Sequence, residues 1–209
     1  MRKIGILGLV GVFVLALASC GGGGGDGPHT VVIQSVSDQP VDGDVGFTAP
    51  STFLVSQADA TGNVQYGIDS GGTEFRAFLD FPLDGSTGGG VVPLNAAIVS
   101  ADIEVFVNNV SFSLSVPTLL ELVPFSILGL ISADFDSTPL LTRSSFDIDT
   151  LDINNFVRID VTSLMAEAQR QGMSNLQLRF LLDFTAATGL VVLNDGTPGR
   201  APVLTVEFR

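Results

Sequence analysis

Residues Glu74–Phe81 read EFRAFLDF, and this stretch decides the fold class of the chain. One set of alternate positions is wholly apolar and consists of Phe75, Ala77, Leu79 and Phe81. The other set is mixed and consists of Glu74, Arg76, Phe78 and Asp80. Strict alternation is typical of a β-strand, because successive side chains of a strand point to opposite faces of its sheet. We therefore expect a half-buried strand whose apolar set faces a core.

Segments with strand character recur on both sides of this stretch. These segments are rich in β-branched and aromatic residues, which favour strands. They are Thr30–Val36, Ser51–Ser56, Asn63–Ile68, Ile98–Val107, Val157–Val161, Leu176–Phe184, Leu190–Asn194 and Val203–Phe208. Turns rich in Gly, Pro and Asp separate them, and Ser37–Pro50 is expected to be a loop. Thr162–Gln171 is the one expected helix, with Gly172 placed to end it. This order predicts an all-β fold, an antiparallel β-sandwich of jelly-roll type with one short helix.

The phases of these strands also predict the core. The expected members are Phe75, Leu79, Phe81, Ile103, Val105, Ile159, Val161, Leu178 and Phe180. The most hydrophobic stretch after the N-terminal region, Leu119–Ile131, has two interpretations: a loop that touches a membrane or a partner, or a buried strand interrupted at Pro124 and Gly129. It contains Glu121, is too short to span a bilayer and lacks a basic face, so we favour the buried strand.

The first twenty residues predict where the protein is located. Arg2 and Lys3 precede the uncharged apolar run Ile4–Leu17, which is shorter than the roughly 20 residues that a membrane-spanning helix needs. This is the design of a secretory signal. The run ends in Leu17-Ala18-Ser19-Cys20, which resembles the bacterial lipobox and contains the only cysteine of the chain. The resemblance implies cleavage before Cys20 and lipidation of Cys20, which would anchor the protein in a membrane.

The residues after Cys20 suit such an anchor. The run Gly21–Gly25 can neither continue a helix nor pack in a core, and it behaves as a flexible tether. We therefore expect a lipoprotein signal peptide at residues 1–19, a lipidated cysteine and Gly-rich tether at residues 20–29, and a single β-sandwich domain at residues 30–209. Gly21 is not the aspartate that retains lipoproteins in the inner membrane of enteric bacteria. The resemblance therefore implies the bacterial cell envelope, at the outer membrane or the cell surface.

Composition excludes several classes of partner and chemistry. The formal net charge is −13 and the only lysine is Lys3, so nucleic acid is not expected as a partner. With Cys20 lipidated and no lysine after residue 3, cysteine nucleophiles and Schiff bases are excluded. The one histidine, His29, ends the tether, where it cannot be held rigidly for a catalytic triad or a metal site. Paired carboxylates could serve a glycan-active hydrolase or lyase, but no pair is distinguished, and we expect a protein that is not an enzyme.

Four stretches, in order, resemble the DNRLRE-domain family. They are Arg76–Leu83 (RAFLDFPL), Ile98–Val107 (IVSADIEVFV), Val157–Leu164 (VRIDVTSL) and Ala201–Phe208 (APVLTVEF). Members of that family are extracellular β-sandwich modules of jelly-roll type in bacterial surface and secreted proteins, and some act as carbohydrate-binding modules. The resemblance covers roughly Thr30–Arg209. It implies a jelly-roll fold and, by analogy with those members that bind carbohydrate, a surface-binding function.

Three arginines are candidates for ligand binding. Arg76, Arg158 and Arg179 each share the polar face of a strand with a nearby aspartate, namely Asp80, Asp160 and Asp183. The arginines could form a strip that binds sugar hydroxyls or carboxylates, or they could form cross-strand ion pairs that order a sheet face. We favour the ion pairs, because each arginine has a carboxylate nearby.

Three aspartates are candidates for a calcium site, and no other cofactor is expected. Asp147, Asp149 and Asp152 offer carboxylate oxygens, and calcium takes about 6–8 oxygen ligands. The run lacks the glycine of an EF-hand loop, and Ile148 and Ile153 fit a strand with a solvated face, so we favour solvated acid.

Two functions follow from these expectations. The first is a non-catalytic, lipid-anchored surface module that binds polysaccharide or matrix. The second is a structural or assembly lipoprotein that packs against another envelope protein.

Overall fold

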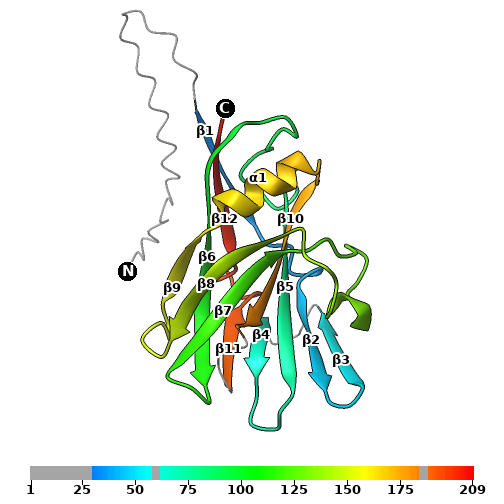
Figure 1. Cartoon of the computed structure of the whole chain (residues 1–209). Helices are drawn as coiled ribbons and strands as arrows, with labels where there is room; N and C mark the ends of the chain where they lie inside the picture. The colour runs from blue at the N-terminus through cyan, green and yellow to red at the C-terminus, as the bar shows by residue number, and fades with distance from the viewer. Residues whose placement is uncertain (1–29, 58–61, 184–187) are drawn as a thin grey trace, which may run out of the picture.

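The computed structural model describes residues 30–57, 62–183 and 188–209. Within them, one antiparallel sheet curls around a core (Figure 1). Its strands are β1 (Val31–Val36), β2 (Gly43–Thr48), β3 (Thr52–Gln57), β4 (Asn63–Ile68), β5 (Glu74–Pro82), β6 (Ile98–Ser111), β7 (Ser115–Leu122), β8 (Leu141–Asp149), β9 (Phe156–Asp160), β10 (Asn175–Leu182), β11 (Gly189–Asn194) and β12 (Val203–Phe208). Helix α1 (Thr162–Arg170) and a 3-10 turn (Ser132–Asp134) accompany the sheet. The predicted all-β sandwich with one short helix is confirmed.

The order of the strands brings distant parts of the chain together. Neighbours follow the path β1-β12-β6-β11-β4-β5-β10-β7-β8, while β2 joins β3 to β5 and β9 pairs with β6. The first strand, the C-terminal end and α1 lie at one end of the sandwich (Figure 1). In the ranges just given, no helix combines the length and the apolar character needed to cross a bilayer.

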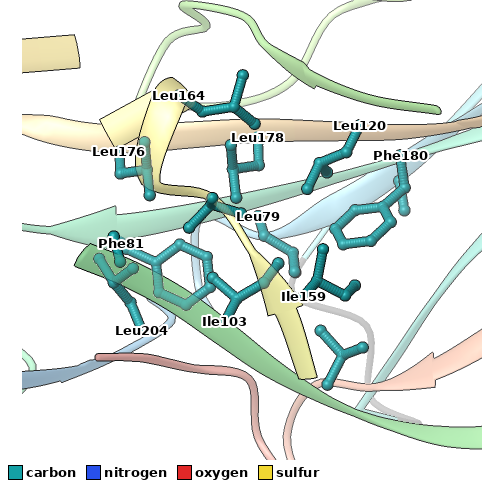
Figure 2. Close-up of a cluster of buried hydrophobic side chains, with 14 of the residues drawn as sticks. Leu79, Phe81, Ile103, Leu120, Ile159, Leu164, Leu176, Leu178, Phe180 and Leu204 are labelled. Atoms are coloured by element: carbon teal, nitrogen blue, oxygen red, sulfur yellow. The ribbon is translucent and has the colours of Figure 1, made fainter. Parts of the chain in front are cut away.

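The core lies inside the curl of the sheet. Every side chain that the sequence predicted to be buried is buried, and all but Phe75 belong to one large cluster. In Figure 2, Ile103 of β6 and Ile159 of β9 lie near Leu79 and Phe81 of β5 within this cluster. Burying one such side chain stabilises a protein by about 1.5–3 kcal/mol. The alternating pattern therefore identified the main source of stability.

The half-buried state predicted for β5 is wrong, because β5 is buried on both faces. Phe78 and Asp80, which the pattern placed toward solvent, have no exposed surface. Phe78 belongs to a second cluster with Val41, Val45, Phe125, Leu130 and Phe135. The last three come from residues 123–137, which we call the covering segment because it lies over the outer faces of β5 and β10. Alternation separates the two faces of a strand but does not show what covers each face.

Two further expectations are wrong in part. The expected loop Ser37–Pro50 contains β2, which pairs with β3 and β5. A Cβ atom on Gly43 of β2 would collide with the carbonyl oxygen of Ser56 on β3, so this glycine permits close pairing where the sequence suggested a turn. The expected buried strand in Leu119–Ile131 ends at Leu122, and Leu128 beyond it is 94% exposed.

Candidate functional site

The outward side of β6 carries the candidate site. Alternate residues of β6 fill the core, so Asp102, Glu104 and Phe106 point away from it. On the adjacent β9, Arg158 lies opposite Glu104 and Phe156 lies opposite Phe106. Residues directly opposite in a sheet share a face. We call this surface the β6 face, and it comprises Asp102, Glu104, Phe106, Asn108, Phe156, Arg158, Asn63, Asn194 and Arg200.

Arg158 is an exposed cation that an ion pair orients. Its Nη2 donates to Oδ2 of Asp102 at 2.6 Å, while 64% of its side chain is exposed. This hydrogen bond and the negative charge of Asp102 raise the pKa of Arg158. The guanidinium group has five N–H donors, and only one of its bonds is needed for this pair. Arg158 can therefore donate to a ligand without leaving Asp102.

An aromatic pair lies beside Arg158. Phe106 and Phe156 meet edge to face, with ring centroids 5.1 Å apart. The guanidinium carbon of Arg200 lies 4.3 Å from the centroid of the Phe106 ring. Phe106 is consequently buried, whereas Phe156 is 50% exposed. The exposed part of Phe156 offers an apolar ring surface of the kind on which sugars stack.

A β-bulge brings three amide side chains together at the other end of the β6 face. The pairing of β6 with β11 shifts by one residue at Asn108, and a bulge of this kind re-aims a side chain. The Nδ2 of Asn108 donates to Oδ1 of Asn63, and Nδ2 of Asn194 donates to Oδ1 of Asn108 at 3.5 Å. Asn194 also donates to the hydroxyl of Thr197 at 3.0 Å. Amides combine donors with acceptors, which is what sugar hydroxyls require.

A hollow of about 230 Å³ adjoins this amide cluster. Its lining combines polar and apolar side chains, those of Asp44, Leu54, Ser56, Asn63, Val64, Gln65 and Val192. The hollow lies between the β2–β3 hairpin and the strands β4 and β11. Asn63 lines the hollow and also belongs to the β6 face. A chain-like ligand on the β6 face could therefore extend into a concave site.

The structure does not bring the three predicted arginines together. Arg76 and Arg179 point outward from β5 and β10, under the covering segment, and are 8% and 3% exposed. The core side chains of β5 and β6 lie between them and Arg158. The strip, the less favoured of the two interpretations, does not form, because Arg76 and Arg179 are buried on one side of the core and Arg158 is exposed on the other.

Arg179 is fully engaged within the protein. Its Nε and Nη2 donate to Oε2 of Glu121 on β7, at 2.9 and 2.5 Å. Its Nη1 donates to the carbonyl oxygens of Asp134 and Phe135, at 3.0 and 2.8 Å, and Nη2 donates to the carbonyl oxygen of Ser137 at 2.9 Å. These bonds attach the covering segment to the sheet.

Arg76 attaches the same segment from the neighbouring strand. Its Nη1 donates to the carbonyl oxygen of Phe135 and to Asp136, and its Nε donates to Glu74 at 2.9 Å. The predicted partner Asp80 instead accepts hydrogen bonds from Asn175 and Gln177 on β10. The favoured interpretation, cross-strand ion pairs, thus holds for Arg158 with Asp102 and for Arg179 with Glu121. The carboxylates in these pairs are not the aspartates of the same strand, because spacing within one strand cannot reveal a partner on another.

The three aspartates proposed for calcium do not form a ligand set. Asp149 accepts from the backbone N–H of Leu151 at 2.7 Å, and Asp152 accepts from that of Asp149 at 2.9 Å. Both carboxylates thus stabilise the turn after β8, while Asp147 lies within β8. Among the described residues, no group of three or more His, Cys, Asp or Glu side chains could hold a metal ion.

No known family model and no curated protein matches this sequence. The residues expected to carry the anchor and the tether, including Cys20 and His29, lie outside the described residues. The β6 face and the hollow are therefore identified as a candidate site from their geometry alone.

Most of the β6 face was missed in the sequence. Phe156 lies two residues before Arg158, so the period of the strand could have placed both on one face. The pair Asn108-Asn109 interrupts the alternation that begins at Ile98, which is a signal for a bulge. Nothing local in the sequence places Asn63 or Arg200 beside them.

Proposed function

We propose that this protein is a non-catalytic, lipid-anchored module of the bacterial cell envelope whose β6 face binds polysaccharide. The observation that carries the proposal is that Phe156 and Arg158 lie on the same face of β9. Phe156 offers an exposed ring, and Arg158 offers a cation that its ion pair with Asp102 orients. Protein sites for small polar ligands combine apolar surface with a few placed polar groups. The β6 face has both, and the hollow gives it a concave end.

The charges of the β6 face favour a neutral glycan. Arg158 and Arg200 are balanced by Asp102 and Glu104, within a chain of net charge −13. An anionic polymer would meet no local excess of positive charge to offset that repulsion, which reaches about 8 Å at physiological ionic strength. Binding through arginine and aromatic side chains needs no metal, so a chelator should leave it unchanged.

A glycan array tests this proposal. The wild-type protein should be retained by a neutral polysaccharide, and Phe156→Ala and Arg158→Ala should each weaken retention. Phe112→Ala is the matched control, because Phe112 is 52% exposed but lies at the end of the β6–β7 hairpin. No retention by any glycan, or equal retention by the Phe156 and Phe112 variants, contradicts the proposal. Loss of retention with a chelator would point instead to a cation held by carboxylates.

The lipid anchor and the extracellular role are proposed from the sequence alone. The lipobox-like residues before Cys20 support acylation of that cysteine, and the Gly-rich tether supports display at the outer membrane or cell surface. The resemblance of four stretches to the DNRLRE-domain family supports an extracellular, carbohydrate-binding role.

An assembly lipoprotein that packs against another envelope protein is the second candidate. Exposed apolar side chains favour it: Leu54 on β3 is 62% exposed and Leu128 in the covering segment is 94% exposed. β3 pairs only with β2 among the described strands, so its outer edge could accept a further strand. Stoichiometric co-purification of one envelope protein, lost in Leu54→Asp but retained in Phe156→Ala, would favour assembly over glycan binding.

A further inference from the structure

Two buried carboxyl groups from distant parts of the chain, those of Asp42 and Asp195, lie within hydrogen-bonding reach of one another. Asp42 ends the turn at residues 38–42, Asp195 follows β11, and their exposed fractions are 0% and 2%. The backbone N–H of Asp80 donates to Oδ1 of Asp42 at 2.6 Å. The other oxygen, Oδ2 of Asp42, is buried and has no hydrogen-bond donor among the described residues. A buried polar atom without a partner is rare in a native protein and requires an explanation.

The surrounding charges do not compensate the pair. Asp38 in the same turn adds a negative charge that acts on Asp195. The carboxylate of Asp80 is directed to the amides of Asn175 and Gln177, and Arg200 lies over the Phe106 ring. Ser37 donates to Asp195 at 3.5 Å but brings no charge. Within the described part of the chain, the groups that act on the pair include no cation.

We propose that Asp42 and Asp195 share one proton, which makes them a pH-sensitive clasp between the turn at residues 38–42 and the segment that follows β11. In the closed clasp, Oδ2 of Asp42 carries the proton and donates it in a hydrogen bond to the carboxylate of Asp195. The orphaned oxygen thereby becomes a donor, and the pair carries one negative charge in place of two. Loss of the proton to solvent leaves two facing carboxylates. The clasp joins the segments that carry Asp44 of the hollow and Asn194 of the β6 face.

The direction of the pKa shift agrees with this geometry. Burial raises the pKa of Asp42 well above its usual value, and the charge of Asp195 and a hydrogen bond with it raise that pKa further. Burial also raises the pKa of Asp195, whereas its bond with Asp42 acts in the opposite direction. The placement of the proton on Asp42 rests on the geometry, since Oδ2 of Asp42 is the buried oxygen without a hydrogen-bond donor. A carboxyl group with a raised pKa in the folded state contributes its full stability below the pKa of the unfolded chain. That contribution is lost as the pH rises toward the folded pKa.

Urea unfolding of the full chain between pH 4 and pH 9 tests the clasp, with Asp42→Asn as the informative variant. Asparagine keeps an acceptor for the N–H of Asp80 and provides an N–H donor toward Asp195 without taking a proton from solvent. The unfolding constant of the wild type, divided by that of the variant, should rise by up to about tenfold per pH unit above about pH 4. The same ratio for Asp84→Asn, an exposed carboxylate with a lowered pKa, should not rise. A ratio for Asp42→Asn that does not change with pH overturns the proposal.

Two measurements keep the test decisive if that variant fails to fold. In the wild-type protein between pH 4 and pH 9, carbon-13 NMR should find an aspartate carboxyl carbon of the pair that keeps the chemical shift of a protonated acid above about pH 4, where free aspartates are ionised. Ionisation of both Asp42 and Asp195 at about pH 4 overturns the proposal. Added calcium at pH 7 should leave the wild-type unfolding midpoint unchanged. A calcium-dependent rise that Asp195→Asn abolishes would overturn the shared proton and assign the pair to a cation.

Discussion

Replacing Arg179 by methionine should destabilise the protein far more than replacing the exposed Arg158 by alanine. Arg179 is 3% exposed and donates to Glu121 and to three carbonyl oxygens of the covering segment. Methionine fills similar apolar space but donates no hydrogen bond. The variant therefore leaves Glu121, itself 8% exposed, as a buried carboxylate without a cation.

The magnitude follows from that unpaired charge. Removing one partner of a buried ion pair costs about 3–5 kcal/mol, because the remaining charge loses its compensation. A domain of this length loses about 2–4 °C in Tm for each kcal/mol, so a cost of about 4 kcal/mol lowers the Tm by about 8–16 °C. The hydroxyl of Thr142 donates to Glu121 at 3.2 Å, and this bond does not depend on Arg179. The loss of stability should therefore be smaller than the sum of the contributions of all the bonds that Arg179 makes.

Thermal and urea unfolding of three variants measure this effect. Arg158→Ala is the control, because Arg158 also has a carboxylate partner but is mostly exposed, and exposed ion pairs contribute little. The double variant Arg179→Met with Glu121→Gln should recover much of the loss, since it removes the unpaired charge. If Arg179→Met has the same Tm as Arg158→Ala, or if Glu121→Gln recovers nothing, the reasoning from the buried pair is refuted.

Three further outcomes are expected. Cys20→Ser should move the protein from the membrane fraction and remove the mass of the acyl chains, and unchanged detergent partitioning and mass would contradict lipidation. Phe81→Ala should cost about 3–5 kcal/mol in urea unfolding, whereas Leu151→Ala, at 83% exposed, should have little effect; equal midpoints would contradict the assigned strand phase. Gly67→Ala should destabilise more than Gly72→Ala. Both glycines have positive φ, for which a side chain costs about 1–2 kcal/mol, but only at Gly67 does an added Cβ collide with the carbonyl oxygen of Gly189.

The sequence predicted the core well because the core depends on strand phase. The residues at alternate positions of β5, such as Leu79 and Phe81, are buried as the period of two requires. The end of α1 was also predictable from local sequence, because Gly172 adopts a positive φ of 68° just beyond the last turn. β2 was missed because Gly43 and Asp44 resemble a turn when only their neighbours in sequence are considered. What makes them a strand is the tight pairing with β3 and β5, which local composition does not report.

The candidate site was harder to predict, because the same pattern had different outcomes on different strands. Arg76, Arg158 and Arg179 all occupy outward positions of alternating strands, yet two are buried and one is exposed. The difference comes from the covering segment, whose Phe135 carbonyl accepts from both buried arginines. The buried arginines met that segment only through the topology of the whole chain.

This contrast supports the proposal that the β6 face, not the opposite side of the sandwich, is the binding surface. One outer side of the sandwich is closed by the covering segment, and the guanidinium groups of Arg76 and Arg179 are used to hold that segment in place. To reach these guanidinium groups, a ligand would have to break their buried hydrogen bonds and ion pairs. Breaking a buried ion pair is strongly destabilising, because it leaves a charge without its partner. On the other side, Arg158 is already exposed and oriented, so a ligand there replaces bonds to water and breaks no hydrogen bond within the protein. Binding through arginine in this protein is therefore expected at Arg158, whereas substitutions of Arg76 and Arg179 are expected to reduce stability first and binding only as a consequence.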